Sequence, residues 1–383
     1  MLKKVKVLHV VGAMNRAGTE TMLMNIYRNI DHSAYHFDFV SYDQDVAHYD
    51  QEIEKLNGRI IRLTRTNSIK QLYDAIKKYG PYDVVHAHTL FHCGIVSFAA
   101  FLAAVDIRIA HAHTTADKSN RFLRKVYITL MRFLINVFST NLLACSNEAG
   151  QYLFGEASLS NKKYRYFPNL IDYSKFMKVS KKEVNNFKQA ESLGKCNIVI
   201  GHIGTFKASK NHKFLVAIMK HLIKKDPTIN MLLIGDGELK NQIEAKVKKA
   251  GMREQVKFIG ISDNIPTILH SMDVFVFPSI YEGLGLVLLE AQASGIPCIV
   301  SEAIQPEADL GLGLLEKVPL AEGPHIWAER IIQVAAKKEG NKNNIINAFE
   351  KSGYSLTNGI ATLRELYDRN MGGKYEQGTH RLF

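Results

Sequence analysis

Two glutamates, Glu282 and Glu290, stand in a nearly apolar stretch, PSIYEGLGLVLLEAQASGIP, that runs from Pro278 to Pro297. An ionised carboxylate among leucine, valine and alanine is costly unless a partner compensates its charge. Glycines lie between the two glutamates, and a helix is expected from about Leu286. A glycine-lined helix N-terminus suits a diphosphate, and a carboxylate one turn further on can accept hydrogen bonds from two adjacent hydroxyls. The pair therefore indicates a nucleotide that carries a sugar. The alternative is that Glu290 pairs with a buried lysine or arginine.

Further candidate residues lie at the ends of predicted strands. The loop Gly204–Lys210 follows one strand, and Gly235–Gly237 follows the next. Near the start of the chain, Gly12–Gly18 follows the first strand, while His111 and His113 end another. In open parallel sheets, ligands bind beyond the carboxyl ends of the strands. We therefore expect these segments to form the ligand-binding edges of the fold.

The elements that must position these residues alternate between strand and helix along the whole chain. Helical patterns, such as those at 19–30 and 69–80, separate short β-rich runs, which is typical of parallel sheets with helices on both faces. Two series of strands predict an α/β fold of two Rossmann-like, doubly wound domains at 1–175 and 195–350. A last helix at about 354–370 could pack back on the first domain. The predicted strands are 5–11, 36–42, 58–63, 83–88, 108–113, 140–146, 164–169, 196–204, 230–237, 255–260, 273–279 and 297–302.

Length and composition limit the class of protein. A chain of 383 residues with 46% hydrophobic residues is long enough for two cores. The sequence has no run of 18 or more uncharged apolar residues, so it predicts no membrane span. The apolar run Val5–Val11 is too short for a signal peptide. The four cysteines are far apart, so we expect reduced thiols in a cytoplasmic protein, without a disulfide or zinc framework. The net charge of +12 favours anionic partners such as nucleotide phosphates, lipid head groups or nucleic acid.

Three weaker patterns bear on cofactors. His86 and His88, like His111 and His113, form H-x-H on a strand, where alternate residues share a face and could bind a metal. No acidic or cysteine ligand is near them in sequence, so we expect no metal. A D-x-D pattern at 43–45 lies in a polar loop and is interpreted as chance. The glycine loops do not contain G-x-G-x-x-G, which argues against a nicotinamide cofactor.

The stretch 118–138 predicts a basic amphipathic helix, and a helix of this kind can lie on a membrane of anionic lipid. The alternative is an ordinary helix with one core face and one solvated face. The candidate membrane-surface residues are Arg121, Arg124, Lys125 and Arg132, and the apolar residues predicted on the opposite side are Phe122, Val126, Leu130, Phe133 and Leu134.

Several motifs occur in an order that resembles a known family. The strand V-F-V-F-P-S leads into E-x7-E and then E-A-Q-A-S-G-I-P; PNLID, IGTFKASKNHKFLV, LLIGDGEL and VKFIGISDNI precede it. With VVHAH, IAHAHTT and the first glycine loop, these motifs resemble the retaining nucleotide-sugar glycosyltransferases of the GT-B fold, glycosyltransferase family 4, over nearly the whole chain. The pattern K-N-H-x-F-L resembles the subgroup that makes exopolysaccharide and capsule. The resemblance implies two Rossmann-like domains facing across a cleft.

The resemblance also implies roles at matching positions. Glu290 would bind the ribose, Glu282 the hydroxyls of the donor sugar, and Lys210 the phosphate charge that develops on the leaving nucleoside diphosphate. His113 would hydrogen-bond the donor sugar or the acceptor near the anomeric carbon. Thr205 stands where the family usually has an arginine, and it lacks that charged fork. The catalytic candidates are His113, Lys210 and Glu282; the nucleotide-sugar-binding candidates are Gly204, Thr205, Lys207, Lys210, Glu282, Gly283, Leu284, Gly285, Leu286 and Glu290; the acceptor-side candidates are Gly12, Asn15, Arg16 and Gly18.

These inferences together predict a retaining glycosyltransferase that moves a hexose or N-acetylhexosamine from a UDP-sugar to a growing, lipid-linked glycan. We expect no metal or other cofactor, no nucleic-acid partner, and a cytoplasmic protein at the inner face of the plasma membrane. The alternatives are a nucleotide-sugar epimerase on the same fold, which would consume donor without an acceptor, and a degenerate, non-catalytic sugar-nucleotide binder, which Thr205 leaves open. A basic nucleic-acid-binding protein ranks far behind, because the aromatic residues lie mostly in strand-like or amphipathic positions.

Overall fold

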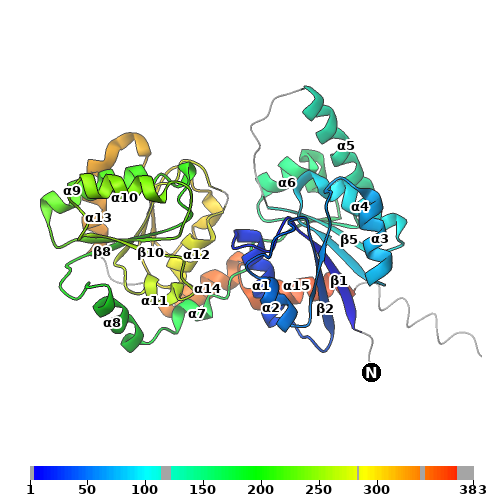
Figure 1. Cartoon of the computed structure of the whole chain (residues 1–383), viewed down its shortest axis with the longest axis horizontal. Coiled ribbons are helices and arrows are strands. Elements are labelled where there is room, and N and C mark those ends of the chain that lie inside the picture. The colour runs from blue at the N-terminus through cyan, green and yellow to red at the C-terminus, as the bar shows by residue number, and fades with distance from the viewer. Residues whose placement is uncertain (1–3, 114–121, 283, 337–340, 369–383) are drawn as a thin grey trace, which may run out of the picture. The chain divides into compact units, whose positions relative to one another are not determined.

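The computed structural model describes residues 4–113, 122–282, 284–336 and 341–368 (Figure 1). It divides into two compact units: unit 1 holds the described residues up to Leu170 and those from Gly353 onward, and unit 2 holds Ile171–Ser352. Each unit is built on one sheet whose neighbouring strands are all parallel. The predicted α/β class with two doubly wound parallel sheets is therefore confirmed.

The sheet of unit 1 has seven strands in the order β3-β2-β1-β4-β5-β6-β7. Most of its strands are buried runs rich in valine, isoleucine and phenylalanine, as expected where helices cover both faces of a parallel sheet. The strands are β1 (Val5–Val10), β2 (Tyr35–Ser41), β3 (Arg59–Arg62), β4 (Val84–Ala87), β5 (Ile107–Ala112), β6 (Asn141–Ala144) and β7 (Tyr164–Tyr166).

Two hydrophobic clusters, one on each face of this sheet, hold the helices of unit 1. One cluster contains residues of α3, α4, α5 and α6, and the other contains residues of α1, α2 and α15. Serine side chains cap α3 and α6 by accepting hydrogen bonds from backbone N–H groups of the first turn. The helices are α1 (Gly18–Asn29), α2 (Asp50–Lys55), α3 (Ile69–Tyr79), α4 (Cys93–Leu102), α5 (Phe122–Phe138), α6 (Asn147–Phe154) and α15 (Leu356–Asp368), with short 3-10 turns at Leu90–His92 and Glu156–Ser160.

The helix α15 comes from the end of the chain and packs on unit 1. Leu363 and Leu366 lie in the hydrophobic core of unit 1, and the hydroxyl of Tyr367 forms a hydrogen bond of 3.0 Å with Nδ1 of His86. The hydroxyl of Tyr35 donates to the carboxylate of Asp368. Helix α15 thus covers one face of the first sheet.

The sheet of unit 2 has six strands in the order β10-β9-β8-β11-β12-β13. They are β8 (Val199–Ile203), β9 (Asn230–Ile234), β10 (Val256–Gly260), β11 (Val274–Phe277), β12 (Cys298–Val300) and β13 (Leu315–Lys317). Helices α9, α10 and α13 share one core cluster, and α11 and α12 lie across the sheet from them (Figure 1). The helices are α7 (Ser174–Met177), α8 (Lys181–Ala190), α9 (His212–Lys225), α10 (Lys240–Lys249), α11 (Ile265–Leu269), α12 (Leu286–Ala293), α13 (Gly323–Ala335) and α14 (Lys342–Ser352), with 3-10 turns at Ala208–Lys210, Pro306–Ala308 and Leu320–Glu322.

Each sheet reverses its strand order once. In unit 1 the chain returns from β3 to place β4 on the other side of β1, and in unit 2 it returns from β10 to place β11 on the other side of β8. At such a reversal the loops after the two central strands diverge and leave a crevice at the carboxyl edge of the sheet, which is where open α/β sheets bind ligands. The two candidate ligand-binding edges are therefore at β1/β4 and at β8/β11.

Two sequence predictions about composition can be compared with the structure. All four cysteines are free; Cys93, Cys145 and Cys298 are buried, whereas Cys196 is half-buried. Within the described residues, the helices lack the combination of length and hydropathy that crossing a bilayer requires.

Candidate functional site

The loop after β8 lies at the reversal point of unit 2 and is held by close backbone packing. Gly235, at φ +130°, lies so close to Gly204 that an added Cβ atom would stand 2.3 Å from the Gly204 carbonyl oxygen. Gly237 abuts Phe206 in the same way, and the Phe206 N–H donates to the Asp236 carbonyl over 2.9 Å. The glycines of the G-D-G motif are thus required by the space between two loops.

Lys210 and Glu282 join the loop after β8 to the loop after β11. The Lys210 ammonium donates to a carboxylate oxygen of Glu282, and these side chains are only 12% and 17% exposed. The ammonium also lies 4.5 Å from the centre of the Phe277 ring. A backbone hydrogen bond fixes the same junction, since the Ile280 N–H donates to the Ser209 carbonyl over 2.8 Å. Burial lowers the pKa of Lys210, and Glu282 opposes that shift.

The N-terminus of α12 follows directly on this junction. Gly285, its N-cap residue, has φ +71°, a left-handed conformation that favours glycine, and no side chain caps the helix. The amide groups of the first turn therefore lack a side-chain acceptor and can bind an anion. Leu284 is buried and Leu286 is half-buried at this turn.

Glu290 lies one turn into α12 and is half-buried among apolar neighbours. Burial raises the pKa of its carboxyl to about 7. No lysine or arginine in the part of the chain that the structure describes forms an ion pair with it. Because helical side chains lean toward the helix N-terminus, the carboxyl of Glu290 is directed toward the first turn of α12.

The remaining described candidates of unit 2 lie on the same edge. Gly204 is half-buried beside the aliphatic chain of Lys210, while Thr205 and Lys207 are exposed. Gly283 lies outside the described residues. The adjacent strands β8 and β11 thus bring the loop Gly204–Lys210 together with Glu282 and α12.

A chain of histidine side chains lies at the reversal point of unit 1. Nδ1 of His9 is 3.2 Å from Nε2 of His88, and Nδ1 of His88 is 2.9 Å from Nε2 of His113. Nδ1 of His113 lies 3.1 Å from the side-chain oxygen of Asn169. His86 and His111 stack beside this chain. His9 and Asn169 were not among the sequence candidates.

These histidines are neutral at physiological pH. Burial lowers the pKa of His9 to about 3 and that of His113 to about 4, and it holds the pKa of His88 well below its ordinary value. Both ring nitrogens of His113 already form hydrogen bonds within unit 1. A ligand that bonds to either nitrogen must therefore replace Asn169 or His88.

Two histidine triplets have the proximity that metal ligands need. Nitrogen atoms of His9, His86 and His88, and of His88, His111 and His113, lie within 4.8 Å of one another. The facing nitrogens of His9, His88 and His113 are engaged with one another, so metal binding would break those hydrogen bonds. In the D-x-D pattern, a carboxylate oxygen of Asp43 accepts from the backbone N–H of Asp45, which is a local turn.

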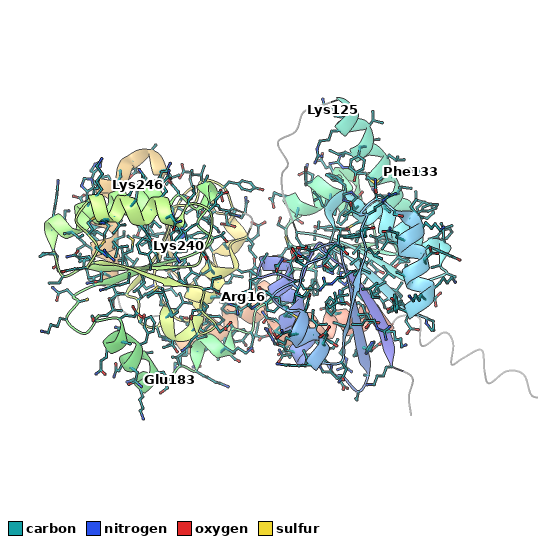
Figure 2. All side chains as sticks on the ribbon, in the orientation of Figure 1. Arg16, Lys125, Phe133, Glu183, Lys240 and Lys246 are labelled. Atoms are coloured by element: carbon teal, nitrogen blue, oxygen red, sulfur yellow. The ribbon has the colours of Figure 1, made fainter. Side chains whose placement is uncertain are left out.

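The loop Gly12–Gly18 lies beside the histidine chain in sequence and begins α1 at Gly18. The Gly12 carbonyl accepts from the Tyr42 N–H, and the Asn15 side chain accepts from the His48 N–H, so both residues shape the loop. Gly12, Asn15 and Arg16 are exposed, and Figure 2 labels Arg16 on this loop.

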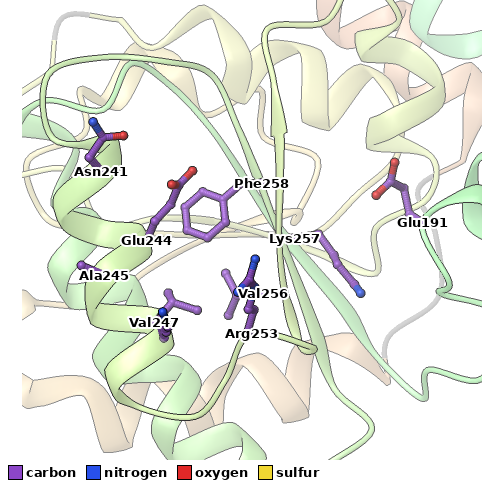
Figure 3. A pocket seen from close by; sticks show the side chains of 10 residues that line it. Glu191, Asn241, Glu244, Ala245, Val247, Arg253, Val256, Lys257 and Phe258 are labelled. Atoms are coloured by element: carbon purple, nitrogen blue, oxygen red, sulfur yellow. The ribbon is translucent and has the colours of Figure 1, made fainter.

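A separate hollow in unit 2 contains none of the candidate residues. Asn241 and Glu244 of α10 line it together with Arg253, Lys257 and Phe258 (Figure 3). It lies beside β10, an edge strand, away from the reversal point at β8/β11. We therefore assign the candidate site to the loops after β8 and β11.

Comparison with known proteins identifies the family. The model described as "Glycosyltransferase Family 4" matches residues 16–175, and the model described as "Glycosyl transferases group 1" matches residues 183–349. The protein named "Putative glycosyltransferase EpsF" of Bacillus subtilis (strain 168) is 36% identical over 370 residues, covering 95% of this chain and 96% of EpsF. This chain belongs to glycosyltransferase family 4.

Two further relatives of this transferase carry more specific names. The capsular polysaccharide biosynthesis glycosyltransferase CapH of Staphylococcus aureus is 27% identical, covering 90% of this chain and 95% of CapH. The Escherichia coli UDP-Gal:alpha-D-GlcNAc-diphosphoundecaprenol alpha-1,3-galactosyltransferase is 30% identical, covering 61% of each chain.

Solved structures agree with the GT-B fold of the transferase. The crystal structure of Anabaena HepE in complex with UDP and glucose superposes with a TM-score of 0.75 at 18% identity, over 94% of this chain and 98% of HepE. At that identity the likeness establishes the fold.

Proposed function

We propose that this glycosyltransferase moves a hexose or N-acetylhexosamine, with retention of configuration, from a UDP-sugar to a growing lipid-linked glycan in exopolysaccharide or capsule biosynthesis. The observation that carries the proposal is Glu290, a half-buried carboxyl that no described cation pairs with, one turn behind an uncapped helix N-terminus. The names of CapH and of the E. coli galactosyltransferase favour the same pathway class and donor.

Each group at the β8/β11 edge has a chemical role in this proposal. The first turn of α12 binds the diphosphate, and Glu290 accepts hydrogen bonds from the ribose hydroxyls. Lys210 lies beside that turn and stabilises the negative charge that grows on the diphosphate as the glycosyl bond breaks. Glu282 accepts hydrogen bonds from the donor sugar. The exposed Lys207 supplies positive charge near the loop where Thr205 replaces the usual arginine.

The reaction needs little proton transfer to the leaving group, because a diphosphate already leaves as a stable anion. Preorganised donors at the phosphates therefore contribute most of the rate enhancement. We propose the front-face, retaining route of the family, without a metal or other cofactor. In unit 1, His113 contacts the donor sugar or the acceptor by exchanging one of its two present hydrogen bonds, and the loop Gly12–Gly18 receives the acceptor.

The acceptor side also carries a surface suited to a membrane. Val126, Leu130, Phe133 and Val137 are each about half exposed along one stripe of α5, and Figure 2 shows Lys125 and Phe133 projecting from this helix. Apolar side chains with a nearby cation suit the interface of an anionic bilayer. We propose that this stripe, with Lys125, docks the enzyme on the cytoplasmic face of the plasma membrane, where a lipid-linked acceptor is presented.

This arrangement bears on the two interpretations of the helix that the sequence left open. In the alternative of an ordinary helix, Val126, Leu130 and Phe133 would form the core face, but they are exposed. The core side of α5 is formed by Met131 and Ile135, because α4 approaches so closely that a Cβ atom on Gly94 would stand 2.8 Å from the Met131 carbonyl.

Two of the basic candidates also differ from the prediction. Arg132 is half-buried and donates to the Tyr152 carbonyl over 2.6 Å, so it stabilises the fold. Arg124 is half-buried, and Arg121 lies outside the described residues.

The experiment that tests the proposal is a panel of nucleotide sugars scored by thermal shift on the full chain. A ligand that binds the folded state raises Tm by mass action. We expect a UDP-sugar to raise Tm for the wild type and to lose that effect in Glu290→Ala, while exposed Glu254→Ala retains it. A shift with another nucleotide only, or one unchanged by Glu290→Ala, would contradict the proposal. UDP release without an acceptor-linked product would instead identify an epimerase.

A further inference from the structure

We propose that Glu282 is the internal counter-ion of Lys210 and competes with the donor's diphosphate for it, so that the site discriminates a UDP-sugar from free UDP. This inference rests on the proposed function. It concerns the ion pair between the loops after β8 and β11.

The surroundings of the pair make the competition strong. Both side chains are largely withdrawn from water, and the Lys210 ammonium has the Glu282 carboxylate on one side and the Phe277 ring on another. Lys207 adds a second positive charge that acts on Lys210. A carboxylate in this position occupies the ammonium that a phosphate oxygen would otherwise engage, because both anions seek the same donor.

The sugar decides the outcome of this competition. With a UDP-sugar bound, hydroxyl groups of the sugar donate to Glu282, and the released ammonium of Lys210 turns to the diphosphate. With UDP alone, Glu282 has no hydroxyl to accept from and stays on Lys210. The pair therefore weakens the binding of the product UDP relative to the donor and favours product release after transfer.

Removing the carboxylate should tighten the binding of a bare diphosphate. In Glu282→Gln the ammonium of Lys210 remains in its partly buried position without an anionic partner, which is costly until an anion binds. We expect affinity for UDP and for inorganic pyrophosphate to rise roughly tenfold, which is the typical effect of one additional charge-assisted hydrogen bond. Exposed Glu254, at the amino end of β10, provides the matched control: Glu254→Gln removes the same charge and should change neither affinity.

The measurement is isothermal titration of the full chain with UDP and, separately, with inorganic pyrophosphate. Wild type, Glu282→Gln, Glu254→Gln, Lys210→Met and the double variant Lys210→Met/Glu282→Gln are compared. The increase in affinity from Glu282→Gln should disappear in the Lys210→Met background, which a general loosening of the site would not produce. Equal or weaker binding in Glu282→Gln, or an equal increase in both backgrounds, would overturn the inference.

The same titrations separate this inference from the proposed function. Pyrophosphate binding that tightens in Glu282→Gln, together with UDP binding that Glu290→Ala leaves unchanged, would support the counter-ion role and contradict the nucleotide site around Glu290. Absence of pyrophosphate and UDP binding in every variant would overturn both.

Discussion

At the scale of single residues, Glu290 illustrates how one buried carboxyl can cost stability. Its pKa of about 7 means that the folded protein holds this proton more tightly than the unfolded chain, whose ordinary value is 4.5. Stability is therefore lost as pH rises from about 4.5 to 7, and the loss is complete above pH 7. The stability of the fold alone therefore does not explain why a carboxyl is present at position 290.

The first prediction follows from the direction in which stability changes with pH. At pH 8, Glu290→Gln should melt higher than the wild type by about 2–8 °C, which corresponds to about 1–2 kcal/mol after allowance for partial exposure. The difference should disappear below about pH 4, because the wild-type carboxyl is then largely neutral in both states. Melting curves at several pH values test this, with Glu254→Gln as the control for loss of a charge. A difference that stays constant with pH would contradict it.

His9 illustrates what a residue-level analysis of the sequence missed. It lies on β1, next to β4, which carries His86 and ends just before His88, and it bonds to His88. The sequence did contain a pattern that places His9 on a buried face of β1: it alternates with Val5, Val7 and Val11 at a spacing of two residues. The order of strands in the sheet, which one sequence does not state, was needed to bring it beside His88.

At the scale of elements, the packing of the loops after β8 and β9 explains the G-D-G spacing without invoking a ligand. Gly235→Ala would place a methyl group 2.3 Å from the Gly204 carbonyl in a left-handed backbone conformation. We predict a loss of about 3 kcal/mol or more in the stability of unit 2.

A matched control separates the clash from backbone strain. Gly251 also has a positive φ, +69°, but an added Cβ atom there meets nothing within 4 Å. Gly251→Ala should therefore cost only about 1 kcal/mol. Urea denaturation of Gly235→Ala and Gly251→Ala measures the two losses of stability. Equal losses would show that the close approach to Gly204 is unimportant.

Most strands were predictable because short apolar runs alternate with helical patterns, and the twelve expected runs overlap β1 to β12, with β2 and β5 each beginning one residue before the expected run. The strand β13 was missed: Leu315–Lys317 is short, carries two charges and lies at the edge of its sheet, so it has little apolar periodicity. The sequence left open which side of α5 is buried. Both of its sides are apolar, and the close approach at Gly94 decides which one is buried.

At the scale of the whole molecule, the two parallel sheets and the agreement of both family models establish what kind of enzyme this is, while individual surfaces decide where it works. The exposed stripe of α5 belongs to unit 1, and the candidate donor edge belongs to unit 2. Membrane docking and donor binding can therefore be perturbed separately.

The membrane prediction uses this separation. Lys125→Glu combined with Phe133→Ser should reduce binding of the full chain to anionic phospholipid vesicles at least roughly tenfold, because it removes an apolar side chain and reverses a charge. Lys246→Glu, at an exposed position of α10 in unit 2, is the charge control and should change binding little. The nucleotide-dependent rise in Tm should survive in both variants. Vesicle sedimentation that is unchanged in the double variant would refute docking through α5.

The central claim is that Glu290 binds the ribose of a uridine nucleotide, and titration calorimetry of UDP at pH 8 tests it most directly. Glutamine keeps the size of the side chain and removes the charge that accepts two hydroxyl hydrogen bonds. We predict that Glu290→Gln weakens UDP binding roughly 10- to 100-fold while Glu254→Gln matches the wild type. Equal affinity in wild type and Glu290→Gln would contradict the account.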